Sequence, residues 1–183
     1  ATCSYKRPEM TEALAQIDTP DDQTEELEYK LVDAPTLELF HYNNRQIRCN
    51  VGPVGSGKTT AATWEVFYFL PWWLFNRLGM VRTKWVITRN TYRELVDTTQ
   101  ATVFEWFYTI GDHLKGDEIF TIDWSKLYDD GPTVTALFRA CDKPEDAKKF
   151  KSLEITGYWD DESIEVPEGI KRIQKTRIGR FPK

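Results

Sequence analysis

The chain has 183 residues, of which 40% are hydrophobic and 29% charged, which places it in the range of one globular domain with a sizeable core. Its net charge of −5 excludes a protein that coats nucleic acid or an anionic membrane through its overall charge. Any contact with DNA must therefore be local. Cys3, Cys49 and Cys141 have no CxxC spacing, so they indicate neither a disulfide framework nor a zinc site and favour a reducing compartment.

The first 30 residues are expected to form an acidic, mobile arm. Residues 9–28 are rich in Glu, Asp, Gln and Thr and show little apolar periodicity, which is typical of a segment that cannot build a core. We expect a single domain to occupy residues 31–183. The most apolar stretch, residues 66–75, contains Pro71 and is far shorter than the ~20 residues that cross a bilayer. It is expected to be buried core, and no membrane contact is predicted.

The next elements are expected to be a strand, a glycine loop and a helix. Residues 45–51 have the pattern of a short strand, residues 52–57 that of a loop, and residues 58–69 that of a helix that Pro71 ends. Downstream, residues 84–88 and 133–138 are expected to be strands, since their apolar residues are β-rich or alternate.

The second half of the chain is also expected to alternate helices with strands. A helix is expected over residues 91–108, with Glu94 in its first turn, and a buried strand over residues 153–161. Strands that alternate with helices predict a mostly parallel α/β sheet.

Residues 52–59 meet the GxxxxGK[ST] pattern of a phosphate-binding P-loop in full. The glycines let backbone N–H groups turn toward phosphates, Lys58 reaches the β and γ oxygens, and the Thr59 hydroxyl is expected to bind Mg²⁺. The alternative interpretation is a glycine-rich turn that happens to precede a lysine. We expect ATP to be bound by Gly52, Pro53, Val54, Gly55, Ser56, Gly57, Lys58, Thr59 and Thr60.

An acidic triplet follows the last expected strand. A P-loop ATPase needs a carboxylate at the end of a neighbouring strand to hold the metal and a second group to activate water. Asp161 is expected to hold Mg²⁺ and Glu162 to polarise the attacking water, which makes Lys58 and Glu162 the expected catalytic pair. Because Asp160 stands where a hydrophobic residue usually precedes such a pair, the register could shift to Asp160 and Asp161. The other alternative is a solvated acidic turn.

Several further segments resemble the large terminase subunits of tailed bacteriophages. Arg89-Asn90-Thr91-Tyr92-Arg93-Glu94 and the residues up to Thr99 are similar to the segment after the second strand in that family. Residues 152–162, the pair Val166-Pro167, and Arg177-Ile178-Gly179-Arg180-Phe181-Pro182 are also similar to it. With the P-loop, the resemblance extends from about residue 35 to residue 182.

This resemblance implies the ATPase part of a DNA-packaging motor in the host cell cytoplasm. Members assemble as a homo-oligomeric ring on the portal of a procapsid, act with a small terminase subunit, and pump double-stranded DNA by ATP hydrolysis. They also carry a nuclease domain, which is not expected within these residues. The P-loop lacks the arginine often found in the family, so a cation from elsewhere is expected to act on the phosphates. The candidates are Arg139, Lys149, Lys151, Arg177 and Arg180.

The expected fold is therefore a three-layer P-loop NTPase of the ASCE/RecA-like kind, with Mg²⁺-ATP at the carboxyl ends of a mostly parallel sheet. Two other functions stay open: a helicase-like DNA-dependent ATPase, and an assembly protein that ATP switches without turnover. Phe40 and Tyr42 could stack on adenine, although aromatic residues there are more often core. His41 and His113 have no metal-ligand spacing and are expected to be surface or hydrogen-bonded histidines.

Overall fold

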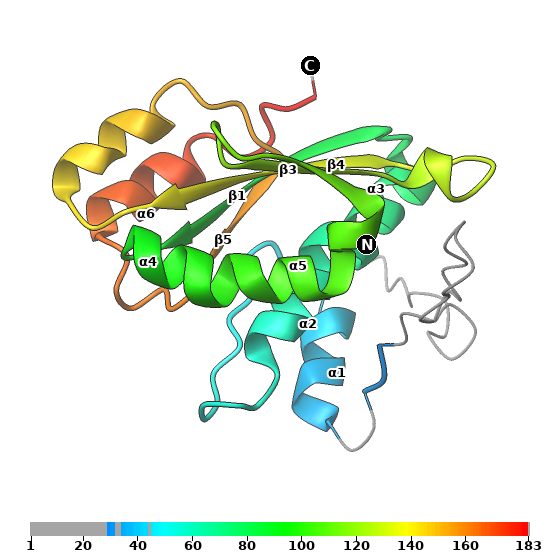
Figure 1. Cartoon of the computed structure of the whole chain (residues 1–183), viewed down its shortest axis with the longest axis horizontal. Coiled ribbons are helices and arrows are strands. Elements are labelled where there is room, and N and C mark those ends of the chain that lie inside the picture. The colour runs from blue at the N-terminus through cyan, green and yellow to red at the C-terminus, as the bar shows by residue number, and fades with distance from the viewer. Residues whose placement is uncertain (1–28, 32–33, 44, 183) are drawn as a thin grey trace, which may run out of the picture.

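The computed structural model describes residues 29–31, 34–43 and 45–182, so nearly all of the expected acidic arm lies outside the described residues. Within the described part, a five-stranded sheet has the order β2-β3-β4-β1-β5 (Figure 1). Its strands are β1 (Arg82–Arg89), β2 (Gly111–Leu114), β3 (Ile119–Asp123), β4 (Thr133–Ala140) and β5 (Gly157–Asp160).

The centre of the sheet is parallel and one side of it is antiparallel. β1 pairs in parallel with both β4 and β5, as the alternation of strands and helices predicted. β2, β3 and β4 pair antiparallel, and the β2–β3 hairpin was not predicted, because four residues of β2 are too few to show a period. The expected strand over residues 153–161 is shorter than predicted: only β5 is a strand, and Ile155 makes an isolated bridge to Ile178.

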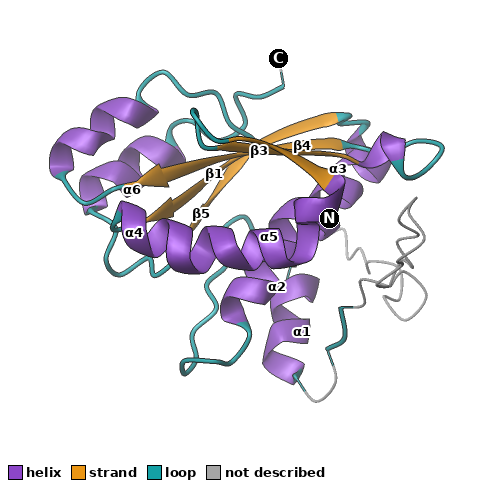
Figure 2. Cartoon of the chain, in the orientation of Figure 1, coloured by secondary structure: helices purple, strands orange, loops and turns teal. Residues whose placement is uncertain are grey.

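Helices cover both faces of the sheet (Figure 2). One face carries the helices between residues 58 and 110, and the other carries those around β5. In chain order they are α1 (Pro35–Tyr42), α2 (Lys58–Trp64), the π-helix η1 (Glu65–Phe69), α3 (Leu70–Leu78), α4 (Tyr92–Glu94), the π-helix η2 (Leu95–Gln100), α5 (Ala101–Phe107), η3 (Tyr108–Ile110), η4 (Trp124–Lys126), η5 (Pro144–Phe150) and α6 (Glu168–Lys175).

Two hydrophobic clusters follow from the alternation of side chains along β1. Trp85 and Ile87 point into a large aromatic cluster with Trp64 of α2 and Phe107 of α5. Val86, between them, points to the opposite face and packs in a smaller cluster under α6 and η5. Because successive residues of a strand face opposite sides, the chain forms three layers: helices, sheet, helices.

Residues 45–51 are not a strand, which corrects the expectation. A strand is stabilised by ladder hydrogen bonds to a neighbour, and this segment pairs with none of the described strands. Its β-favouring residues Ile47 and Val51 are exposed, so neither face is buried. The segment is held through Arg48 instead, which donates to the Phe40 carbonyl at 3.0 Å and pairs with Glu65 at 2.6 Å.

Pro71 does not end the first long helix, which corrects a second expectation. The helical course continues from Lys58 to Leu78 and stops at Gly79, whose φ of 64° is left-handed. Proline lacks an N–H, so the carbonyl four residues earlier loses its donor. That carbonyl belongs to Phe67, and it accepts a hydrogen bond from the Trp124 Nε1–H at 2.9 Å. A distant indole thus replaces the missing helical donor.

The helix that follows β1 has an unusual period. Thr91 caps it, accepting a hydrogen bond from the Glu94 N–H at 3.2 Å. Four of its buried residues, Leu95, Thr99, Val103 and Phe107, lie four positions apart, and Gln100 beside Thr99 is buried as well. An α-helix turns once in ~3.6 residues, so a four-residue repeat would drift away from the sheet. The π-helical turns of η2 widen the helix and keep this stripe facing the core.

We expect Trp124→Phe to lower the free energy of unfolding by about 2–4 kcal/mol, because a buried carbonyl loses its donor and a smaller ring leaves a gap. Pro71→Ala in that background should recover part of the loss, since the restored N–H at position 71 can donate to Phe67. Urea unfolding of the single and double variants measures this coupling. Trp85→Phe is the control, because its Nε1 has no partner among the described residues. Strict additivity would contradict the link.

Candidate functional site

The glycine loop ahead of α2 folds around its own lysine. Gly55 and Gly57 have φ values of 77° and 74°, a left-handed conformation that favours glycine. The Lys58 Nζ donates hydrogen bonds to the carbonyls of Gly52 and Pro53 at 2.9 and 2.7 Å. The Pro53 carbonyl also accepts from the Ser56 hydroxyl at 2.8 Å. The loop therefore forms a closed, exposed turn with an ammonium group at its centre.

The other predicted loop residues lie around this turn. Val54 projects fully into solvent. Thr59 and Thr60 are half-buried in the first turn of α2, whose Ala61 N–H donates to the Gly57 carbonyl at 2.8 Å. The loop and the helix of the predicted motif are therefore present, but the segment before them is irregular and not a strand.

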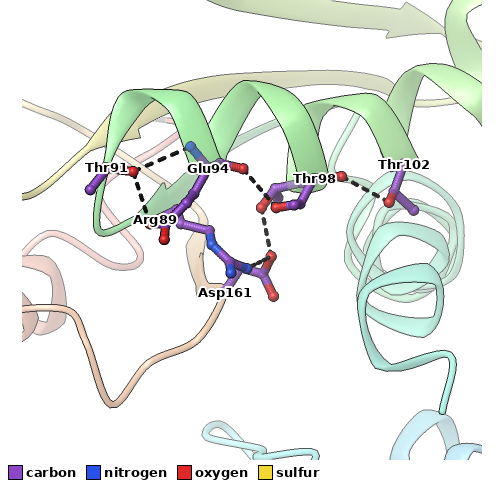
Figure 3. Close-up of polar contacts among 7 residues, drawn as sticks. Arg89, Thr91, Glu94, Thr98, Thr102 and Asp161 are labelled. Atoms are coloured by element: carbon purple, nitrogen blue, oxygen red, sulfur yellow. Dashed lines mark hydrogen bonds and ion pairs between the residues drawn. The ribbon is translucent and has the colours of Figure 1, made fainter. Parts of the chain in front are cut away.

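Asp161 lies directly after β5, with its carboxylate held on one side. Its Oδ2 accepts hydrogen bonds from the Arg89 Nη1 at 2.8 Å and the Thr99 hydroxyl at 2.6 Å. The side chain is 10% exposed. Thr99 lies on the helix that packs against α2, since Trp64 and Phe107 are in ring contact. Asp161 therefore faces the helix after β1 (Figure 3), which lies in the same layer as α2 and the glycine loop.

Asp160 faces the opposite layer. Its Oδ1 accepts hydrogen bonds from the Thr88 hydroxyl and from the Gln174 Nε2, the latter at 2.8 Å. Burial raises the pKa of this carboxyl, and the two hydrogen bonds oppose that shift only in part. Asp160 is thus bound to α6, while Asp161 is bound to the helix after β1. Asp161, and not Asp160, therefore lies on the side of the glycine loop.

Glu162 is exposed and has a φ of 52°. A residue with a Cβ rarely adopts this conformation, and such residues are frequent at functional sites. The turn is closed by the Glu165 N–H, which donates to the Glu162 carbonyl at 2.9 Å. The carboxylate of Glu162 therefore projects from a tight turn immediately beyond Asp161.

The predicted site residues form two groups that lie on one layer. Lys58 and the glycine loop are held by their own carbonyls, whereas Asp161 is held by Arg89 and Thr99. The hydrogen bonds and ion pairs of the described residues do not join these two groups. Those residues also contain no cluster of three or more His, Cys, Asp or Glu side chains suited to a metal ion.

A pocket of about 350 Å³ opens beside the segment that leads into the glycine loop. Phe40 forms part of its wall and stacks under the Arg48 guanidinium, 5.1 Å from the ring centre. The Nδ2 of Asn50 is buried there without a partner among the described residues. Sequence reasoning missed Arg48 and Asn50, although their position just before Gly52 was visible. The lining residues are Thr36, Leu39, Phe40, Asn43, Arg48, Cys49, Asn50 and Val51.

The basic residues considered for the phosphates differ in how they are held. The Arg139 Nη1 donates to the carbonyls of Asp117 and Phe138 at 2.9 and 2.7 Å, and Lys149 pairs with Asp146 at 2.7 Å. Lys151 and Arg180 are exposed, and Arg177 is half-buried.

The two histidines are hydrogen-bonded or partly buried. His41 is fully buried, between the Tyr29 hydroxyl at 3.1 Å and the Glu65 carboxylate at 2.6 Å. The Nε2 of His113 lies 3.8 Å from the Glu118 carboxylate. The expectation of a surface or hydrogen-bonded histidine is confirmed for His41 and wrong for His113, whose two ring nitrogens are buried without a hydrogen-bond partner among the described residues.

Comparisons with known proteins show the fold. No protein-family model and no curated protein match the chain. The large terminase of a thermophilic bacteriophage is similar, with a TM-score of 0.56 and 14% identity over 70% of this chain. The same terminase in complex with ADP has a TM-score of 0.56 and 16% identity over 70% of this chain. The chain spans 30% of the first terminase chain and 29% of the second.

These similarities define a mixed α/β fold, with a centrally parallel sheet, of the kind found in a phage large terminase. In the part of the chain that the structure describes, no helix has the length and apolar character needed to traverse a bilayer.

The raised pKa of Asp160 predicts a pH dependence of stability. A buried acid whose folded pKa lies above its unfolded value destabilises the fold as pH rises from the unfolded value, about 4, through the folded one. Asp160→Asn keeps an oxygen that accepts from Thr88 and Gln174 but cannot ionise. The variant should therefore gain stability relative to the wild type over this pH range. Urea unfolding between pH 4 and 8 measures the difference, and a pH-independent difference would contradict the assignment.

Proposed function

We propose that this chain is a Mg²⁺-dependent ATPase of the DNA-packaging motor type, similar in role to the ATPase part of a phage large terminase. The observation that carries the proposal is a complete P-loop on α2, on the same layer as the buried carboxylate of Asp161. The terminase-like fold supports it, and the similar terminase has been solved in complex with ADP.

The glycine loop fits the phosphates of ATP. Lys58 binds two carbonyl oxygens of the loop, and phosphate oxygens, which carry negative charge, are stronger acceptors for the same ammonium group. Gly55 and Gly57 permit the backbone to turn its N–H groups toward them. Residues 52–60 thus bind and orient the phosphates.

The pocket beside Asn50 fits the adenine base. Its volume of about 350 Å³ lies within the range of small-molecule sites. The Asn50 Nδ2 is a buried donor without a partner among the described residues, and the ring nitrogens of adenine accept hydrogen bonds. Phe40 gives the pocket an apolar wall, which corresponds to the stacking role considered from the sequence.

Asp161 and Thr59 are the residues that would hold a magnesium ion. Mg²⁺ prefers oxygen ligands and is usually bound through one or two carboxylates together with substrate phosphates, so a cluster of three acidic residues is not required. When bound, the ion neutralises phosphate charge during transfer. Asp161 has one carboxylate oxygen, Oδ1, without a donor among the described contacts.

Glu162 acts on the attacking water. Its exposed carboxylate follows Asp161 directly and projects from a tight turn, so it can accept a proton from a water molecule beside the phosphates. Lys58 binds the negatively charged phosphates. Phosphate binding is thus assigned to the glycine loop, and proton transfer to the turn after β5.

The hydrolysis drives translocation of viral double-stranded DNA into a procapsid through its portal, in the host cell cytoplasm. The working form is a homo-oligomeric ring that also contacts a small terminase subunit. Arg177 or Arg180, near the end of the described chain, supplies the cation that the P-loop lacks to a neighbouring subunit. The acidic net charge restricts DNA contacts to local basic surfaces such as α6, with Lys171, Arg172 and Lys175.

Three variants test the proposal. Lys58→Ala should weaken ATP binding about 100-fold, since two charge-assisted hydrogen bonds are worth ~3 kcal/mol. Asp161→Asn should weaken binding only when Mg²⁺ is present. Glu162→Gln should keep binding and lower turnover at least ~100-fold. Titration calorimetry measures binding, and phosphate release measures turnover.

Lys115→Ala, in the exposed turn between β2 and β3, is the control for loss of one lysine. Wild-type affinity in Lys58→Ala would refute the site. Tight Mg²⁺-ATP binding without turnover in the wild type, at every protein concentration, would favour the nucleotide-switched assembly protein, and unwinding of forked DNA without a procapsid would favour the helicase.

A further inference from the structure

The ion pair between Arg89 and Asp161 has a consequence for the metal. Resting on the function proposed above, we propose that Arg89 is the built-in counter-ion of Asp161, and that a divalent cation at Asp161 takes over its role. Arg89 and the divalent cation thus bind the Asp161 carboxylate in turn, and not at the same time.

Asp161 needs a counter-ion because the ion pair is largely buried. The Arg89 Nη1 lies 2.8 Å from the Asp161 Oδ2, and the two side chains are 15% and 10% exposed. A carboxylate removed from water is strongly unfavourable unless a positive group or hydrogen bonds compensate it. Without a cation, Arg89 provides this compensation, together with the Thr99 hydroxyl.

The position of Arg89 is fixed by the sheet. Arg89 is the last residue of β1, and Asp161 follows the last residue of β5, its parallel neighbour. The Asp161 N–H donates to the Thr88 carbonyl at 2.9 Å, which extends the ladder by one step. The guanidinium and the carboxylate therefore meet at the carboxyl edge of the sheet, on the side of α2.

The guanidinium is held mainly by this one carboxylate. Its Nε is buried and has no partner among the described residues, so the ion pair with Asp161 is its principal polar contact there. A group with one strong partner can leave when that partner is taken by a stronger one. A divalent cation is such a competitor, because it carries twice the charge of the guanidinium and would repel it at short range.

The exchange also reaches the helix after β1. Thr99, which shares Oδ2 with Arg89, lies in the π-helix η2. Around it, the hydroxyls of Thr98 and Thr102 donate to the carbonyls of Glu94 and Thr98 at 2.6 and 2.9 Å (Figure 3). Movement of the carboxylate toward a cation therefore changes the hydrogen bond that the Thr99 hydroxyl of η2 makes to Asp161.

The test compares Arg89→Gln, which removes the charge, with Arg89→Lys, which keeps it. Binding of Mn²⁺ to the nucleotide-free chain is measured from the loss of the free-ion electron paramagnetic resonance signal. Arg89→Gln should bind Mn²⁺ about 10-fold more tightly than the wild type, and Arg89→Lys should stay within about 2-fold. Mn²⁺ should also raise the melting temperature of Arg89→Gln more than that of the wild type.

Adding Asp161→Asn to Arg89→Gln should abolish the gain in Mn²⁺ affinity. That result would assign the bound Mn²⁺ to the Asp161 carboxylate. Equal or weaker Mn²⁺ affinity in Arg89→Gln, or no Mn²⁺ binding in either chain, would overturn the exchange. If Arg89→Gln does not fold, the wild type decides: Mg²⁺ should speed the rotation of the Arg89 guanidinium in ¹⁵N magnetic resonance spectra, and unchanged rotation in the presence of bound metal would overturn it.

The two proposals fail separately. Tighter Mn²⁺ binding in Arg89→Gln, with ATP binding unaffected by Lys58→Ala, would leave the exchange standing and remove the ATPase. Loss of ATP binding in Lys58→Ala, with unchanged Mn²⁺ affinity in Arg89→Gln, would do the reverse.

Discussion

The structure depends on the pairing of the last residues of β1 with the residues that end β5. Thr88 donates to Asp160 and Arg89 to Asp161, so two adjacent carboxylates are directed to opposite layers by two adjacent donors. Asp160 is held toward α6 by Gln174, while Asp161 is held toward the helix after β1. A shift of one residue in this parallel register would turn Asp160 toward the helix after β1 and Asp161 toward α6. The register therefore decides which carboxylate can reach a ligand on the glycine loop.

A second constraint holds the glycine loop in place without a sheet. The segment before it pairs with none of the described strands, and its fixed point is Arg48. Arg48 pairs with Glu65 at 2.6 Å, and Glu65 accepts from His41, which contacts the Tyr29 hydroxyl at 3.1 Å. This buried chain ties α1, the loop segment and η1 together. Breaking it at one member would leave a buried charge without compensation.

The sequence predicted the parts of the fold that local pattern controls. The glycine loop, β1 and the helix that begins near residue 91 all follow from residues adjacent in the chain. Pro71 misled the prediction because its compensating donor, Trp124, lies 57 residues away from the carbonyl that it reaches. The partner of Asp161 was hidden for the same reason: Arg89 lies 72 residues earlier, and only the register of two parallel strands brings them together. Local periodicity carries no information about such pairs.

The central claim is that the glycine loop and Asp161 belong to one nucleotide site, and paramagnetic broadening tests it most directly. Substoichiometric Mn²⁺-ATP is added to the ¹⁵N-labelled chain, and the amide signals are recorded. Since broadening falls steeply with distance from Mn²⁺, the amides of Gly57, Thr59 and Glu162 should broaden together and before those of the β2–β3 turn. Broadening confined to the glycine loop, with the Glu162 amide unaffected, would contradict a shared site.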